Sequence, residues 1–227
     1  MDHDLVRWAR AVKARRRLAH PPLWLFADAV RVPDLAAAVA ALPRGLCGVV
    51  FRPEGYPPGL APRIARLCRD RRLWLTVASG PVPAGAGRHL RRGRGRAGAF
   101  ATASAHDRAE VLRARRAGAA LVFLSPLFPT ASHPGGAWLG PLRWARAAHG
   151  VPAAALGGVD GRNLRRVPGA VAAGAIGALL PDGRKWGTPS LPRPLSRHAG
   201  EGGGPSLWPR RHSAAKMPRW PCLRRCG

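Results

Sequence analysis

The chain has 227 residues, enough for one large domain or two small ones, and 46% of them are apolar, enough for a real core. Its formal net charge of +27 would ordinarily suggest a nucleic-acid partner. However, lysine occurs only at Lys13, Lys185 and Lys216, so the charge is almost all arginine, in a chain that is also rich in Ala, Gly and Pro. The aromatic residues do not alternate with the arginines as a base-stacking platform requires. We therefore expect nucleic acid to bind only weakly and without sequence preference.

The sequence carries no targeting or membrane signal that we recognise. No apolar run reaches the ~18 residues of a membrane span, and the basic N-terminal stretch lacks the apolar core of a secretory signal. Cys47 and Cys68 lie in apolar runs and are typical of buried free thiols, whereas Cys222 and Cys226 form a lone C-x3-C, a weak zinc signal. We expect a cytoplasmic protein with no membrane partner.

The predicted elements begin with a basic surface helix in residues 1–20, which carries Leu5, Trp8, Ala9 and Val12 on one side. From residue 23 onward, strand-like and helix-like segments alternate. Strands are expected at 23–28, 48–52, 73–78, 87–90, 99–105, 120–126, 151–158 and 175–181. Helices are expected at 33–43, 60–72, 107–118, 139–150 and 161–174.

These strands are continuously apolar, which indicates burial on both faces and hence a parallel sheet. Eight strands alternating with helices predict a single α/β domain over residues 21–182, a (β/α)8 TIM-type barrel, with an open doubly wound sheet as the alternative. The stretch around residues 79–98 is too short and too rich in Gly, Pro and Arg for full helices, so we expect shortened ones there. Residues 183–227 are rich in Pro, Gly and Arg without any period, which predicts a disordered basic tail.

In a parallel barrel, the groups that carry chemistry gather at the carboxyl ends of the strands. The positions at the expected strand ends are Asp28, Arg52, Ser79, Ser104, His106, Ser125 to His133, Gly157, Gly158 and Pro181. The loop after the sixth strand collects hydroxyl groups and glycines, which suits an anionic ligand such as phosphate. Gly157 and Gly158 lead toward the next helix, where unpaired amides favour phosphate as well.

Four segments resemble the thiamine phosphate synthase family in order and spacing. They are SAHDRAE (104–110), GAALVFLSPLFPTASHPGG (118–136), GVPAAALGG (150–158) and AAGAIGALL (172–180). The SPLFPT core is the most specific of these motifs, and the resemblance extends over roughly residues 22–181. It implies a barrel enzyme that joins hydroxymethylpyrimidine diphosphate to a thiazole phosphate with the aid of Mg²⁺.

The same resemblance implies roles for individual residues. Ser104, Thr130 and Ser132 fall on positions that hold the diphosphate or lie beside it, and Gly157 and Gly158 fall on the pair whose amides hold the thiazole phosphate. On the second strand, the arginine of the family pattern is retained as Arg52. His133 stands where the family has a phosphate-binding lysine.

The sequence also departs from the family where the metal should bind. The family's Asn-Asp after the third strand is replaced around Ala78 and Ser79, and the segment His89–Arg92 lacks the family's metal-binding Asp. The carboxylate ligands expected for Mg²⁺ are therefore missing, and the sequence predicts no metal site. Arg52, Arg91 and Arg92 are candidates to neutralise the diphosphate instead.

Three functions remain open from the sequence. The first is a divergent thiamine phosphate synthase acting on small phosphorylated thiazole and pyrimidine substrates. The second is a barrel that binds the thiazole phosphate without turnover, and the third is a basic nucleic-acid-binding protein. The related thiazole tautomerase type is disfavoured, because Pro126 stands where that branch has its working histidine.

Deleting residues 186–227 is expected to leave the melting temperature of the protein unchanged. The segment has no apolar face of period 2 or 3.6 that could dock on a barrel. Thermal denaturation of the full and shortened chains tests this, and a melting temperature many degrees lower in the shortened chain would contradict it.

Overall fold

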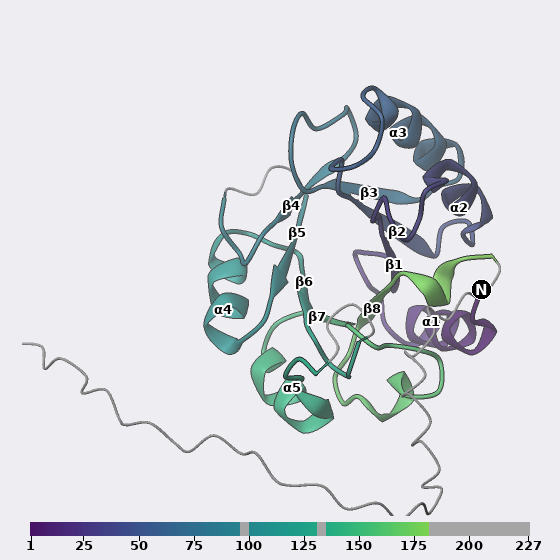
Figure 1. Ribbon diagram of the computed structural model, residues 1–227. Coiled ribbons are helices and arrows are strands. Elements are labelled where there is room, and N and C mark those ends of the chain that lie inside the picture. Colours follow the sequence, from purple (N-terminus) through teal and green to yellow (C-terminus); the bar gives the residue numbers. More distant parts are fainter. Residues whose placement is uncertain (96–99, 131–134, 182–227) are drawn as a thin grey trace, which may run out of the picture. The chain divides into compact units, whose positions relative to one another are not determined.

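The computed structural model describes residues 1–95, 100–130 and 135–181, all within one compact unit, Met1–Leu191. Eight parallel strands close into a barrel in the order β1 to β8 (Figure 1). The strands are β1 (Leu23–Phe26), β2 (Cys47–Phe51), β3 (Trp74–Val77), β4 (Gly87–Leu90), β5 (Ala101–Ala105), β6 (Leu121–Leu124), β7 (Ala153–Leu156) and β8 (Ala172–Ala175). The predicted TIM-type barrel is confirmed, and the open sheet is excluded because β8 pairs with β1.

Helices cover the outside of the barrel unevenly. The α-helices are α1 (His3–Arg15), α2 (Leu35–Ala41), α3 (Leu60–Asp70), α4 (Arg108–Arg116) and α5 (Gly140–Ala148), and the 3-10 turns are η1 (Leu164–Arg166) and η2 (Gly177–Leu179). The chain runs from β3 to β4 through residues 78–86 without a helix, so the shortened helix expected there does not form in this Gly/Pro-rich stretch. Asp107 caps α4 by accepting a hydrogen bond from the amide of Glu110 at 2.8 Å. The predicted tail lies outside the described residues.

The prediction for the last helix and strand is wrong. Residues 161–174 hold only η1 rather than a helix, and β8 lies at Ala172–Ala175 rather than at 175–181. Pro168 and Gly169 interrupt any helix, because Gly169 has a φ of +77°. The strand itself is built from Ala and Gly, since a Cβ on Gly174 would lie 2.8 Å from the ring of Phe26. Pro181 consequently lies beyond η2 and not at a strand end.

Aromatic side chains fill the interior of the barrel. Trp24 and Phe26 from β1 meet Phe123 from β6 edge to face, at ring-centroid distances of 5.6 and 4.8 Å. In the register, Trp24 lies opposite Gly48 of β2 and Gly174 of β8. A Cβ on Gly48 would lie 2.5 Å from the Trp24 ring, so the indole occupies the space that a side chain would need. Small residues on β2 and β8 therefore make room for large ones on β1.

α1 lies against the outside of the barrel next to β1 and β8 (Figure 1). Leu5, Val6 and Ala9 are buried and belong to the apolar layer between the helices and the strands. The Asp2 amide donates to the carbonyl of Ala178 at 2.7 Å, and the Asp2 carboxylate accepts from the Gly161 amide at 2.8 Å. α1 is thus an integral layer of the barrel unit. Within the described residues, no helix is long and apolar enough to cross a membrane.

Gly161→Leu is expected to loosen α1 and to lower the free energy of unfolding by about 1–3 kcal/mol, the usual cost of overpacking. A Cβ at this position would collide with Asp4 and with the backbone of Leu5. Chemical denaturation measures the loss, and hydrogen exchange of the α1 amides locates it. The matched control is Arg162→Leu at the exposed neighbouring position. Equal stability and equal α1 protection in wild type and Gly161→Leu would contradict this docking.

Candidate functional site at the barrel mouth

Arg52 follows the carboxyl end of β2 and leans across the end of β1. Its Nε donates to the carbonyl of Ala27 at 3.0 Å, and its guanidinium carbon lies 6.0 Å from the centroid of the Phe26 ring. It also lies 3.6 Å from a carboxylate oxygen of Asp28, which Arg31 binds at 3.0 Å. Burial alone would raise the pKa of Asp28, but the hydrogen bond and charge of Arg31 and the charge of Arg52 outweigh it and lower that pKa. Asp28 thus holds Arg52 at the mouth.

Arg91 shares this region with Arg52. The Ser79 hydroxyl donates to Glu54 at 2.7 Å and is the main cause that lowers the pKa of Glu54; the charges of Arg91 and Arg52 lower it further. Both guanidinium groups also act on His89, below the mouth. Two cations from β2 and β4 therefore converge on the same end of the barrel.

Ser104 and Arg92 contact each other at the loop after β4. The Ser104 hydroxyl accepts from the Arg92 amide at 3.2 Å, and the Arg92 side chain points to Glu110 of α4 at 3.7 Å. Arg92 has a left-handed φ of +50°, which is uncommon for a residue other than glycine. Of the three predicted arginines, Arg92 is thus the one engaged with a helix outside the mouth.

His106 has a structural role in this arrangement. Its Nδ1 lies 2.9 Å from the carbonyl oxygen of Ser125, and its amide donates to Glu110 at 2.9 Å. These bonds fasten the start of α4 to the end of β6. His106, named above among the strand-end positions, thus joins two elements of the barrel.

Gly157 and Gly158 form the turn that leaves β7, with φ values of +91° and +64°. Their carbonyls are used, since Gly157 accepts from the Phe128 amide at 3.1 Å and Gly158 accepts from the Asn163 side chain at 2.7 Å. Their own amides donate to no acceptor in residues 1–95, 100–130 and 135–181.

The loop after β6 packs directly on this glycine pair. A Cβ on Gly157 would lie 3.0 Å from Pro126 and 3.3 Å from the methyl group of Thr130, and one on Gly158 would collide with the carbonyl of Pro129. The sequence-predicted residues Thr130, Gly157 and Gly158 thus come together in space. Ser132 and His133 lie outside the described residues, so their roles stay predictions.

His89 was not singled out from the sequence as a site residue, although it lies just below the mouth. It is only 4% exposed and projects from β4 into the aromatic interior. Its Nδ1 lies 2.8 Å from the hydroxyl of Thr102, which donates to the hydroxyl of Thr76 at 3.2 Å. The signal in the sequence is a polar residue inside each of three short strands, Thr76, His89 and Thr102, at positions where the pleat points inward.

Comparison with known proteins supports the resemblance found in the motifs. Residues 91–178 match the family model described as thiamine monophosphate synthase, a stretch that runs from the loop after β4 through β8. The match covers less than half of the chain, so this part of the barrel is similar to that family. No curated protein matches the sequence.

Among solved structures, thiamine phosphate pyrophosphorylase from Pyrococcus furiosus is similar at 19% identity and a TM-score of 0.55, covering 69% of this chain and 85% of that one. A designed cube-shaped protein cage follows at 16% identity and a TM-score of 0.46, covering 70% and 64%. FabK from Thermotoga maritima matches at 15% identity and a TM-score of 0.44, covering 74% and 61%. The first likeness supports the barrel fold, and the other two carry no argument.

Resemblance to the thiamine monophosphate synthase family implies Mg²⁺, but the residues present do not fit it. No group of three or more His, Cys, Asp or Glu side chains gathers anywhere in the described ranges. The mouth carboxylates are already engaged, Asp28 by two guanidinium groups and Glu54 by the Ser79 hydroxyl. A magnesium ion needs several free oxygen ligands, which this arrangement does not offer.

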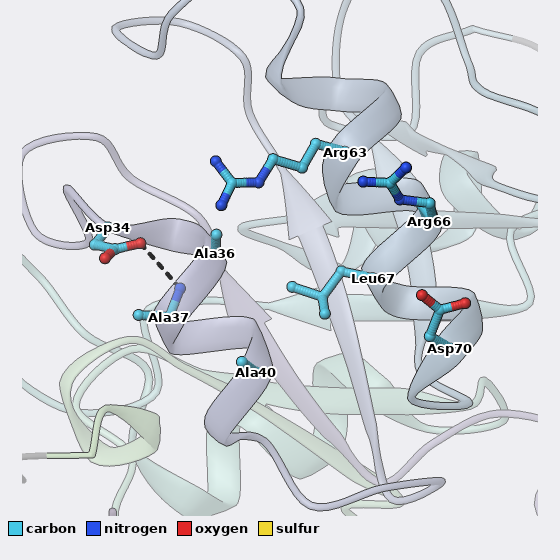
Figure 2. A pocket seen from close by; sticks show the side chains of 8 residues that line it. All are labelled: Asp34, Ala36, Ala37, Ala40, Arg63, Arg66, Leu67 and Asp70. Carbon is cyan, nitrogen blue, oxygen red and sulfur yellow. Dashed lines mark hydrogen bonds between the residues drawn. The ribbon is translucent and has the colours of Figure 1, made fainter.

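A groove of about 450 Å³ lies on the outside of the barrel between α2 and α3. Figure 2 shows its lining, which includes Ala36, Ala40 and Leu67 with Arg63 and Arg66 above them. None of the mouth residues lines it. It is therefore separate from the candidate site.

The unfolding free energy is expected to fall by about 2 kcal/mol between pH 8 and pH 5 because of His89. Burial, followed by the charges of Arg52 and Arg91, lowers the pKa of His89 from 6.5 to about 3. The unfolded chain binds a proton below about pH 6.5, whereas the folded chain does not bind it until about pH 3, so acid favours unfolding across that window. Denaturant titrations at the two pH values measure the change.

The control for this prediction is His89→Gln, which cannot titrate. Its loss of stability over the same pH interval is expected to be smaller by about the same 2 kcal/mol. The carboxyl groups of Asp28 and Glu54 contribute little to the pH dependence of stability above pH 5. Their pKa values in the folded protein lie below the ordinary values of 3.8 and 4.5. Identical pH dependence in wild type and variant would contradict the buried neutral imidazole.

Proposed function

We propose that the chain is a divergent thiamine phosphate synthase, which condenses hydroxymethylpyrimidine diphosphate with thiazole phosphate at the barrel mouth. The observation that carries this proposal is the pair of amides on Gly157 and Gly158, which have no acceptor in the described part of the chain. The pair sits against Thr130, within the stretch that matches the family model. The resemblance to the family supports a role for the paired amides as a phosphate-binding cradle.

Hydrogen bonds from the residues that follow Gly158 fix the conformation of this cradle. Asn163 donates to the Gly158 carbonyl at 2.7 Å, and the Asp160 carboxylate accepts from the amides of Arg162 and Asn163 at 2.9 and 2.8 Å. A turn fixed in this way keeps both glycine amides oriented without a ligand present. Such preorganised backbone donors are what a phosphate monoester needs.

Arg52 and Arg91 are proposed to hold the diphosphate. Both lie at the mouth, and Arg52 has 41% of its side chain exposed, so it can reach a ligand while Asp28 fixes its base. A guanidinium group donates two parallel hydrogen bonds to phosphate oxygens and stays charged at any physiological pH. These two residues supply the positive charge that a metal would otherwise provide.

The proposed reaction requires stabilisation of the negative charge on the departing diphosphate rather than acid–base catalysis. The bond between the pyrimidine methylene carbon and the diphosphate oxygen breaks, and diphosphate leaves with the electron pair. The lone pair of the thiazole nitrogen then forms the new C–N bond, and no proton moves. Fixed cations at the departing oxygen lower the barrier for the first step.

One observation favours a second candidate, a barrel that binds thiazole phosphate without turnover. The described mouth lacks a carboxylate group that could hold Mg²⁺, whereas the glycine cradle is intact. Under this alternative the cradle still binds its phosphate, but mixing both substrates yields no product. The excess of arginine gives the nucleic-acid alternative no comparable site.

Calorimetric titration with each substrate tests the proposal. Thiazole phosphate should bind wild type, and hydroxymethylpyrimidine diphosphate should bind equally well with Mg²⁺ or with a chelator. Arg91→Gln should weaken diphosphate binding by about tenfold, the value of one charge-assisted hydrogen bond, and leave thiazole phosphate binding unchanged. The control is Arg92→Gln, whose side chain faces Glu110 instead.

Gly158→Val provides the complementary variant. Its side chain would collide with the Pro129 carbonyl and with Phe128, so it should displace the loop after β6 and abolish thiazole phosphate binding. A melting temperature near that of wild type shows that the barrel persists. Diphosphate binding that requires Mg²⁺, or that Arg92→Gln weakens as much as Arg91→Gln does, would overturn the arginine site. Absence of thiazole phosphate binding in wild type would overturn the function.

A further inference from the structure

The groove between α2 and α3 has one low apolar wall and one charged wall. α2 itself contributes only alanines to the lining, and Ala40 among them is exposed. α3 contributes the exposed side chains of Arg63, Arg66 and Asp70, with Leu67 half-buried between them. The short alanine side chains leave the hollow of about 450 Å³ open beside Leu67.

Asp70 differs from the other described acidic residues because its carboxylate has no hydrogen bond or ion pair. Its one polar contact is through its carbonyl, which accepts from Arg44 at 3.2 Å. The other carboxylates of the described ranges cap helices and turns, accept from a hydroxyl or pair with arginine; they belong to Asp2, Asp4, Asp28, Asp34, Glu54, Asp107, Glu110 and Asp160. In a chain with 38 lysine and arginine residues and 11 acidic ones, an unpaired carboxylate is an exception.

Arg63 and Asp70 lie toward opposite ends of the charged wall (Figure 2). Seven residues make almost two helical turns, so the two side chains share a face of α3 and their Cα atoms are about 10 Å apart along its axis. The guanidinium group of Arg63 has no ion pair within the described part of the chain either. The wall therefore has an unpaired cation near its start and an unpaired anion at its end.

We propose that this groove is the contact surface between two copies of the chain, related by a two-fold axis perpendicular to α3. The axis sets α3 antiparallel to the α3 of the second copy, so Arg63 lies opposite the partner's Asp70, and the same contact occurs twice. Leu67 of each copy lies close to the axis and fills the hollow beside the alanines. Arg66 is also near the axis, and its long side chain can keep its charge in solvent.

The order of charges on α3 favours a second copy over another occupant. An acidic segment is attracted by Arg63 and Arg66 but repelled by Asp70, and a basic segment meets the reverse. An inverted copy of the same wall presents the opposite sign at both ends. The net charge of +27 repels two copies at long range, but about 0.15 M salt screens charges beyond about 8 Å and leaves close pairs less affected.

Sedimentation equilibrium of the full chain at about 0.2 M salt tests the proposal. Two short helices offer less surface than a stable complex needs, so wild type should pass from monomer to dimer at roughly 1–100 µM. Ala40→Gln places a longer, uncharged and helix-compatible side chain in the hollow and should weaken the dimer severalfold. Thermal denaturation of each variant shows whether its barrel is folded. Wild type that remains monomeric at about 500 µM, well above the range of weak interfaces, would overturn the proposal.

Exchange of the two charges tests the pairing itself. Arg63→Asp alone and Asp70→Arg alone each place like charges opposite each other, and each should raise the dissociation constant by about tenfold or more. The double variant Arg63→Asp/Asp70→Arg restores both pairs in reverse order and should recover most of the affinity. Because the two positions are too far apart to pair within one helix, such a rescue arises between copies. The matched control is Arg116→Asp, at an exposed position of α4, which should leave the dissociation constant unchanged.

The two single variants also separate the proposal from general charge repulsion. Arg63→Asp makes the chain less positive and Asp70→Arg makes it more positive, so general repulsion predicts stronger association for the first and weaker association for the second. Opposite effects of the two variants, or a double variant without rescue, would show that these residues do not pair. Thiazole phosphate binding should be the same in all of these variants, because no mouth residue lines the groove.

Discussion

The remaining structure depends on one packing constraint inside the barrel. Large side chains on β1 require small residues at the facing positions of β2 and β8. Trp24 and Phe26 occupy space that Gly48 and Gly174 leave empty, and Phe123 closes the interior from the opposite side. Eight short strands can close around this filling only with these residues in register. The register in turn decides which side chains reach the mouth. Arg52 and Gly158 converge there because each lies two residues above an inward-facing residue of β2 or β7.

Several of the arginines that give the chain its positive charge donate hydrogen bonds to backbone carbonyls. Arg71 donates to the carbonyl of Leu42, Arg108 to those of Ala147 and His149, and Arg115 to that of Gly150. These guanidinium groups connect neighbouring helices and loops by satisfying carbonyls at helix ends. Arg52 also donates to a backbone carbonyl, that of Ala27, but it differs from these residues because it lies at the barrel mouth together with Arg91.

The sequence predicted the barrel, and it predicted which described residues lie at the carboxyl ends of β2 and β7, because these ends follow from the order of the strands. Arg52, Thr130 and the glycine pair could be found from motifs and position. β8 was misplaced because Ala172–Ala175 has no bulky residue, and only the aromatic rings across the barrel explain why small ones are needed. His89 was overlooked for a related reason. Its meaning depends on Thr76 and Thr102, which are far apart in sequence and adjacent only through strand pairing.

The position of α1 has a consequence for the order of folding during synthesis. This helix is made before the residues that it contacts, because Gly161 lies 159 residues beyond Asp2 and Ala178 lies further still. Until those residues leave the ribosome, Leu5, Val6 and Ala9 have no surface of this barrel to cover them. The apolar face of the first helix is then a site where chaperones or other nascent chains can bind. Once the barrel is complete, this apolar face is buried and can no longer bind other proteins.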